Sequence, residues 1–298
     1  MEKKEHLLIV DGMALLFRAF YATSVYGQFM INSKGIPTNA INGFFKHLFS
    51  AIDQLKPTHV ICCWDMGSKT YRSDLYTDYK GNRPEAPIEL VPQFGLVKQA
   101  VEALDIPNIG IEGFEADDCI GTIVKNYQSQ LPISVLTGDK DLLQLLDIDV
   151  QIVLLQKGIG NYKIYTNDLF SEELGIDPHM LIDVKALMGD SSDNYPGVKG
   201  IGEKTAYKLI GKYRSISGLL ENLTELTKAQ RLKIETDLDM LHLSQQLAEI
   251  NCKVPVQCVL EDALLSIQEE KALLMMHDIE LRGMHVLLSS FTSSREAI

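Results

Sequence analysis

The sequence predicts an α/β protein with a mainly parallel sheet, followed by a helical region. Two observations predict this arrangement. In the first half of the chain, short apolar runs alternate with longer amphipathic runs, which is typical of βαβ units. From about Asp177 the sequence changes to helical segments joined by short turns, and no long linker interrupts it. We therefore expect two parts, residues 1–175 and residues 176–298, that pack as one body.

Three apolar runs are expected to form neighbouring strands, and each ends on an aspartate. The runs HLLIVD, HVICCWD and ISVLTGD end at Asp11, Asp65 and Asp139. In open α/β sheets, ligands bind beyond the carboxyl ends of the strands, so the three carboxylates are expected along one rim. Aspartate also caps helices well, and for any single one of the three this alternative stays open.

Further acids lie in groups near expected element ends. Glu115, Asp117 and Asp118 open a helix that runs from Ala116 to about Tyr127, and other acids follow the third strand and a later glycine. The candidate set is Asp11, Asp65, Glu115, Asp117, Asp118, Asp139, Asp141, Asp190 and Asp193.

So many carboxylates need counter-charge, because like charges in one cleft raise each other's pKa. Oxygen ligands without Cys or His favour Mg²⁺ or Mn²⁺ over zinc. Two such ions roughly 4 Å apart are typical of phosphodiester hydrolysis. The alternative is a set of solvated loop acids. Any single member, Glu115 or Asp141 above all, can also support a ligand without binding an ion.

Cations and tyrosines are interleaved just after Asp65. If this segment is helical, about 100° per residue places five side chains on one face: Lys69, Arg72, Tyr76, Lys80 and Arg83. Such a face suits single-stranded nucleic acid, since cations meet phosphates and rings stack on bases. An ordinary solvated helix face is the alternative, and Gly81 can end the helix early.

The glycine-rich segment GVKGIGEKT fits neither common phosphate-binding motif. A P-loop needs Lys after its last glycine, but Gly202 is followed by Glu203, and the order of the glycines also differs from the dinucleotide fingerprint. Helix, hairpin, helix fits better, with backbone N–H groups at Gly200 and Gly202 facing a phosphate of duplex DNA. Cations gather there: Lys199, Lys204, Lys208, Lys212 and Arg214. A plain helix turn is the alternative.

Composition limits the class of protein. The net charge of −12 argues at first against a nucleic-acid partner, but the acids assigned to a metal cluster account for much of it. The 5 cysteines show no metal-binding spacing, which favours reduced thiols. No secretion signal and no apolar run of membrane length is present. We expect a soluble, cytoplasmic protein without membrane contact.

Six motifs in order resemble those of a known family. IVDGMALLFRAF, GIPTNAINGF, WDMGSKTYRSDLYTDYKGNRP, GFEADDCIGT, TGDKDLLQLL and LMGDSSDNYPGVKGIGEKTA are similar to motifs of bacterial 5′ nucleases. These are the N-terminal 5′-3′ exonuclease domain of DNA polymerase I and its free-standing relatives, akin to flap endonucleases. The similarity covers roughly residues 6–260.

The resemblance implies a PIN-like α/β core, a helical arch at about residues 66–92 and a helix-hairpin-helix module at about residues 180–214 that holds K⁺. It implies Mg²⁺-dependent 5′-3′ exonuclease and flap endonuclease activity, with Mn²⁺ as an alternative ion. The expected substrate is DNA with a 5′ flap or a junction of single strand and duplex, or an RNA–DNA hybrid, in replication and repair. The protein is expected to be a monomer.

The resemblance also assigns residues. Asp11, Asp65, Glu115, Asp117, Asp118 and Asp139 would form a first metal site, and Asp141, Asp190 and Asp193 a second. Lys80 and Arg83 would contact the scissile phosphate, next to Tyr79, and Asp118→Asn is expected to abolish turnover. The remaining expected DNA contacts are Arg18, Lys69, Arg72, Lys199, Gly200, Gly202, Lys204 and Thr205.

Two alternatives are weaker on the same residues. A haloacid-dehalogenase-type phosphatase needs D-x-D after the first strand, but Asp11 is followed by Gly12 and Met13. A catalytically silent PIN-like protein that only binds junctions would be expected to lack some of the acids, and all are present.

Overall fold

The centre of the molecule is a twisted, mainly parallel sheet. The structure is a computed structural model that describes residues 4–25, 27–281, 283, 286 and 288. Within these residues the strand order is β3-β2-β1-β4-β5-β6, and only β6 runs antiparallel to its neighbour. The strands are β1 (Leu7–Asp11), β2 (His59–Cys63), β3 (Asn108–Ile109), β4 (Ile133–Thr137), β5 (Val150–Leu155) and β6 (Tyr162–Tyr165).

Helices cover both faces of this sheet. Alternate residues of β1 point to opposite sides: Leu8 and Val10 join one apolar cluster, and Leu7 and Ile9 join the other. The first cluster is covered by α1 (Gly12–Thr23), α2 (Asn39–Leu55), α4 (Val91–Glu102) and α12 (Glu269–Asp278). The second is covered by α5 (Ala116–Tyr127) and η1 (Asp141–Leu145), and it continues into the helical region.

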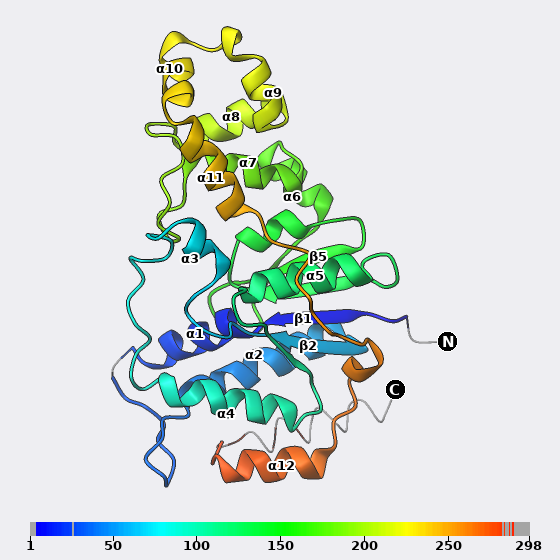
Figure 1. Cartoon of the computed structure of the whole chain (residues 1–298). Helices are drawn as coiled ribbons and strands as arrows, with labels where there is room; N and C mark the ends of the chain where they lie inside the picture. Colours follow the sequence, from blue (N-terminus) through cyan, green and yellow to red (C-terminus); the bar gives the residue numbers. More distant parts are fainter. Residues whose placement is uncertain (1–3, 26, 282, 284–285, 287, 289–298) are drawn as a thin grey trace.

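The helical region extends from one end of the sheet, as Figure 1 shows. It contains a helix-hairpin-helix, formed by α7 (Leu181–Met188), the turn before Glu203, and α8 (Glu203–Tyr213). Helix α11 (Leu238–Ala248) packs along α7 and descends toward α3 (Tyr71–Leu75) and α5. The other elements are α6 (Asn167–Leu174), η2 (Pro178–Met180), α9 (Ile216–Glu221), η3 (Leu223–Glu225) and α10 (Lys228–Thr236).

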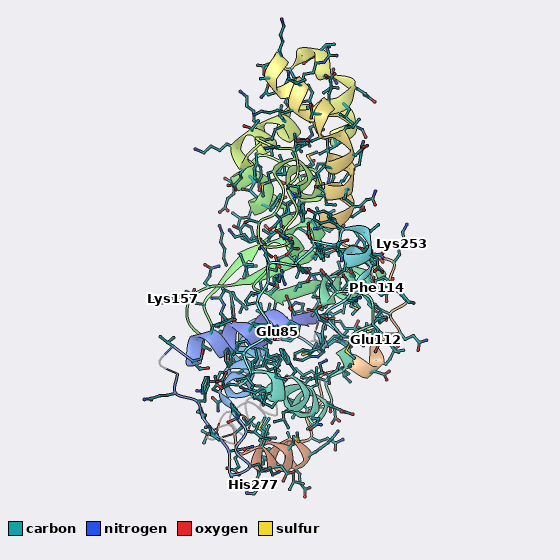
Figure 2. All side chains as sticks on the ribbon, turned by 60° about the vertical axis from the view of Figure 1, so that its left-hand side comes forward. Glu85, Glu112, Phe114, Lys157, Lys253 and His277 are labelled. Carbon is teal, nitrogen blue, oxygen red and sulfur yellow. The ribbon has the colours of Figure 1, made fainter. Side chains whose placement is uncertain are left out.

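After α11 the chain returns to the core. The hydroxyl of Tyr127 donates to the carbonyl of Cys258 at 2.6 Å, and the N–H of Leu265 donates to the carbonyl of Thr58 at 2.8 Å. A short η4 (Glu261–Ala263) and then α12 complete the path, so that α12 with His277 lies at the far end from the helical region (Figure 2). The two regions are therefore joined by two passages of the chain.

The predicted fold class is confirmed. The three predicted strands, which are β1, β2 and β4, and the helices α5, α7 and α8 are present, while β3, β5 and β6 were not predicted. The segment VPVQCVL has a β-like composition that suggests a short strand, but residues 254–260 form none. Helix in the arch segment, residues 66–92, is limited to α3 (Tyr71–Leu75) and the start of α4. Residues 1–3 and 289–298 of the two predicted parts lie outside the described residues. Of the helices described, none is long and apolar enough to cross a membrane.

Candidate active site

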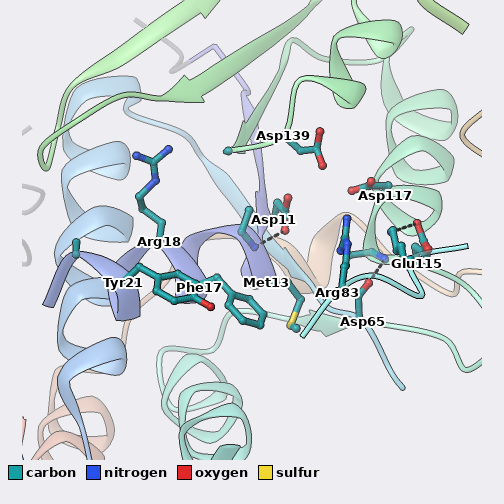
Figure 3. A pocket seen from close by; sticks show the side chains of 15 residues that line it. Asp11, Met13, Phe17, Arg18, Tyr21, Asp65, Arg83, Glu115, Asp117 and Asp139 are labelled. Atoms are coloured by element: carbon teal, nitrogen blue, oxygen red, sulfur yellow. Dashed lines mark hydrogen bonds and ion pairs between the residues drawn. The ribbon is translucent and has the colours of Figure 1, made fainter. Parts of the chain in front are cut away.

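An acidic pocket opens at the carboxyl ends of the central strands. It has a volume of about 760 Å³, and five of the nine predicted acids line it: Asp11, Asp65, Glu115, Asp117 and Asp139. Figure 3 shows these side chains around one space, with the α1 residues Phe17, Arg18 and Tyr21 forming the opposite wall. The strand order explains the convergence, because β1 and β4 are neighbours whose connections leave in opposite directions.

Backbone and hydroxyl groups hold the rim acids in place. Oδ1 of Asp11 accepts the N–H of Ala14 at 2.9 Å, and its Oδ2 accepts the hydroxyl of Thr137 at 2.7 Å. Asp11 is thus both the N-cap of α1 and a pocket residue. Oδ1 of Asp65 accepts the N–H of Ala116 at 2.7 Å, which ties the end of β2 to the start of α5 (Figure 3).

The pocket carries negative charge that its own cations do not cancel. Burial, with a smaller contribution from the charges of Asp65 and Asp139, raises the pKa of Asp11 to about 7 against the hydrogen bonds from Ala14 and Thr137. Burial, Asp139 and Asp11 raise the pKa of Asp117 well above its ordinary value. Crowded carboxylates of this kind fit a hard divalent cation.

A second acidic group lies beside the pocket and is partly neutralised by a residue that the sequence analysis missed. The Nζ of Lys185 forms ion pairs with Asp141 and, at 2.6 Å, with Asp190. Burial and Asp139 raise the pKa of Asp141 to about 7 despite Lys185, whereas hydrogen bonds from Lys185 and Ser192 outweigh burial and lower that of Asp190 to about 2. A lysine in the apolar helix sequence LIDVKALM was the available signal.

Near Lys185 a buried hydroxyl lacks a partner. Tyr195 is 3% exposed, and its hydroxyl has no hydrogen-bond partner among the described residues. Burial raises the pKa of this hydroxyl, the charge of Lys185 lowers it, and the charges of Asp141 and Asp190 raise it, so Tyr195 belongs to the second acidic group. Such a hydroxyl fits a water or a ligand of that group.

Lys80 and Arg83 line the acidic pocket, and their contact with the scissile phosphate stays a prediction. The Nζ of Lys80 lies 2.8 Å from Oε2 of Glu115, and Nη2 of Arg83 lies 2.6 Å from Oδ1 of Asp193. Backbone bonds also join the segment to the 190–194 loop, since the N–H of Lys80 donates to the carbonyl of Asp193 at 2.9 Å. The predicted basic residues thus touch both acidic groups.

The predicted helical cationic face is wrong, because the helix ends at Leu75. Tyr79 is only 6% exposed, so its ring is not available for stacking on DNA; its hydroxyl donates to Asp193 at 3.0 Å and to Glu115 at 3.3 Å. Lys69 remains exposed, and its DNA contact stays a prediction.

Arg72 and Asp118 are not at the pocket, which corrects two further predictions. Asp118 is fully buried, and Arg72 is 2% exposed. Both carboxylate oxygens of Asp118 accept from Arg72 at 2.8 Å, and they also accept the N–H groups of Glu115 and Asn251. Asp118 therefore has no oxygen left to offer an ion, and Arg72 has no surface for DNA.

The predicted hairpin residues lie together in the turn before α8, beside the start of α11. Lys199, Gly200, Gly202 and Lys204 are exposed, and the N–H of Thr205 donates to the carbonyl of Gly202. Some of the predicted cations are already paired: Lys212 with Glu225 at 2.8 Å, and Arg214 with Asp177. Because their charges are already paired, Lys212 and Arg214 contribute less to a phosphate-binding surface than unpaired cations would.

The carboxylates of the pocket are ligands of the kind that divalent ions prefer, but they do not form a preformed coordination site. Within the part of the chain that the structure describes, no three Asp, Glu, His or Cys side chains converge on one point as a preformed metal centre. The carboxylates instead surround a wide basin. Asp11, Asp65, Asp117 and Asp139, together with Glu115, are the residues that would hold ions in the pocket.

Comparison with known proteins agrees with this fold. Residues 6–175 match the model of the 5′-3′ exonuclease N-terminal resolvase-like domain, and residues 176–272 match the 5′-3′ exonuclease C-terminal SAM fold. A 5′-exonuclease of phage T5 with bound divalent zinc has a TM-score of 0.69 at 24% identity, and covers 92% of this chain and 98% of its own. That likeness shows the fold.

Two curated relatives match along the sequence. The 5′-3′ exonuclease of Bacillus subtilis (strain 168) is 58% identical over 292 residues, which is 98% of both chains. DNA polymerase I of Lactococcus lactis subsp. lactis (strain IL1403) is 41% identical over 89% of this chain, and the match spans 31% of that polymerase.

Fold and relatives together define the class of protein as a 5′ nuclease. The chain belongs to the 5′-3′ exonuclease family.

Proposed function

We propose that this protein is a structure-specific 5′ nuclease that hydrolyses phosphodiester bonds near junctions of single-stranded and duplex DNA. The observation that carries the proposal is the acidic pocket at the strand ends, bordered by Lys80 and Arg83. In this reading it acts as a 5′-3′ exonuclease and flap endonuclease that removes RNA primers and flaps in replication and repair, and it works as a monomer.

The proposed metal ligands are Asp11, Asp65, Glu115, Asp117 and Asp139 in the pocket, and Asp141, Asp190 and Asp193 beside it. When bound, two divalent ions, Mg²⁺ or alternatively Mn²⁺, supply activation of water and stabilisation of charge on the phosphate. Among the chain's own groups, Lys80 and Arg83 contact the scissile phosphate and neutralise its charge. Arg18, which lines the pocket, contacts the strand on the α1 side.

Duplex DNA docks on the hairpin of the helical region. Exposed backbone at Gly200 and Gly202, with Lys199, Lys204 and Thr205 beside it, faces a phosphate, and the hairpin holds K⁺. Phage T5 flap endonuclease, which shares the fold, has a structure described as a pseudo-enzyme-product complex with DNA and metal ions. The functional division is then residues 1–175 for cleavage, with the arch segment 66–92, and residues 176–298 for docking, with the hairpin at 180–214.

The test is a cleavage assay on an end-labelled 5′-flap DNA with Mg²⁺ and with EDTA. We expect a product cut close to the junction in Mg²⁺ and no product in EDTA. A parallel substrate with RNA in the flap measures whether the hybrid is cut. Binding without cleavage in Mg²⁺ or Mn²⁺ would contradict the proposal and favour a silent junction-binding protein.

A further inference from the structure

The C-terminal end of α11 is held from two sides by buried side chains. We call residues 247–251 the α11 exit. Nε of Arg72 donates to the carbonyl of Leu247 at 3.1 Å, and its Nη2 donates to the carbonyl of Glu249 at 2.7 Å. From the other side, Nε2 of Gln144 donates to the carbonyl of Ala248 at 3.1 Å, and its Oε1 accepts the N–H of Ile250 at 3.0 Å.

Each of these two side chains is also bonded to a residue of an element that carries acids of the site. Arg72 binds Asp118, whose carboxylate accepts the N–H of Glu115 at 3.1 Å, so it reaches the start of α5. Gln144 lies in η1, and its Nε2 donates to the carbonyl of Asp141 at 3.0 Å. The α11 exit therefore contacts Gln144 and Asp118, which support the two acidic groups. More than 100 residues separate the α11 exit from each of these two residues in the sequence.

The opposite end of α11 is tied to the hairpin. Asp237, which precedes α11, accepts the N–H of Lys199 at 2.7 Å, and Lys233 donates to the carbonyl of Gly200 at 2.8 Å. Between its ends, α11 packs on α7, where Gln245 donates to Asp183 at 2.6 Å. An 11-residue helix spans about 16 Å, so α11 is a strut from the hairpin to the supports of the acids (Figure 1).

We propose that Gln144 and Arg72 are positioning residues that transmit duplex docking on the hairpin, through α11, to the acids of the pocket. The guanidinium of Arg72 at the C-terminal end of α11 complements the helix dipole, and the amide of Gln144 donates to the carbonyl of Ala248 and accepts the N–H of Ile250, so that both hold this end in place. The inference deepens the proposed function, on which it rests: it says why a junction is cut in preference to a free single strand. Neither side chain touches the substrate in this role.

The test uses Gln144→Met, which keeps the size of the side chain and removes its hydrogen bonds. Its matched control is Gln93→Met. Gln93 is also buried and also bonds backbone, accepting the N–H of Ala40 and donating to the carbonyl of Glu89, but it lies away from α11. Rates are measured on a 5′-flap DNA and on a single strand of the same sequence, in Mg²⁺, at a temperature where both variants are folded.

We expect Gln144→Met to reduce the ratio of flap cleavage to single-strand cleavage about tenfold, with the single-strand rate nearly unchanged. Gln93→Met should leave the ratio at its wild-type value. Arg72→Lys should give a ratio between those of the wild type and Gln144→Met, because a single ammonium group replaces the branched guanidinium group. An unchanged ratio in Gln144→Met, or an equal loss in Gln93→Met, would overturn the inference.

A second measurement does not depend on cleavage. Addition of an uncleaved duplex, in Ca²⁺, should slow amide exchange in residues 141–145 and 115–119 of the wild-type protein and not in Gln144→Met. If the wild-type protein fails to cut any substrate, the proposed function fails alone. If it cuts but duplex leaves these amides unchanged, only the coupling through α11 is refuted.

Discussion

The ammonium group of Lys80 lies 2.8 Å from a carboxylate oxygen of Glu115, so a cation of the chain already occupies the edge of the acidic pocket. A divalent ion at Glu115 would have to share this carboxylate with Lys80. Lys80 and a divalent ion are therefore expected to compete for the carboxylate of Glu115.

Lys80→Met is expected to tighten divalent binding while slowing cleavage. Loss of one positive charge beside Glu115 should lower the Kd for Ca²⁺ about three- to tenfold in calorimetry without DNA. Cleavage in saturating Mg²⁺ should fall about a hundredfold, because a phosphate contact is lost. Lys69→Met, an exposed cation of the same segment, should leave the Kd unchanged. Weaker Ca²⁺ binding by Lys80→Met would contradict the competition.

Asp11 should make the metal-free protein less stable as the pH rises. Its folded pKa of about 7 lies above the ordinary 3.8, so the folded chain must release a proton that the unfolded chain has already lost. Stability present below about pH 4 is lost through the window up to about pH 7, by up to about 4 kcal/mol. Thermal melts in EDTA should show Asp11→Asn gaining on the wild type between pH 4 and 7. A constant difference across this range would refute the shift.

Asp118→Asn is expected to act first on folding. It leaves the Arg72 guanidinium buried beside a neutral amide, which costs about 3–5 kcal/mol of unfolding free energy. Denaturant titration should show this loss, and the double variant with Arg72→Met should lose less than the sum of the two single changes. Strictly additive losses would mean that the pair does not act as a unit.

Gly200→Ala tests the hairpin conformation. Gly200 has φ +80°, and a Cβ there would lie 2.8 Å from Nζ of Lys233. We expect a loss of about 1–2 kcal/mol in unfolding free energy, from the left-handed backbone alone. The control is Gly202→Ala, where no atom lies within 4 Å and φ is not positive. Equal stability of the two variants would argue against the hairpin geometry.

The strand-end acids could be predicted from the sequence because their placement is local. An apolar run that ends on aspartate fixes both the strand and the edge at which Asp11, Asp65 and Asp139 lie. Asp117 and Asp118 show where this reasoning stops. They are neighbours on one helix, about 100° apart, and tertiary contacts place Asp117 at the pocket and Asp118 against Arg72.

Tertiary contacts also explain why Tyr79 and Arg72 were assigned wrongly from the sequence. Tyr79 and Arg72 have the composition of a DNA-binding face, but short loops fold them inward onto acids more than 30 residues away. Gln144 carries no charge and no motif, so only its contacts with the α11 exit reveal it. The periodicity and the motif spacing of the sequence do not predict the contacts of side chains whose partners come from distant elements.

The return of the chain from α11 to the core makes the helical region an insertion and not an appendage. It enters through α6 and leaves through residues 249–265, which lie against Tyr127 and Thr58 of the core. A region anchored at two crossings cannot swing on a single pivot. One protease cut in the hairpin region would leave both fragments threaded through the same body, and the nicked protein should still migrate as one particle.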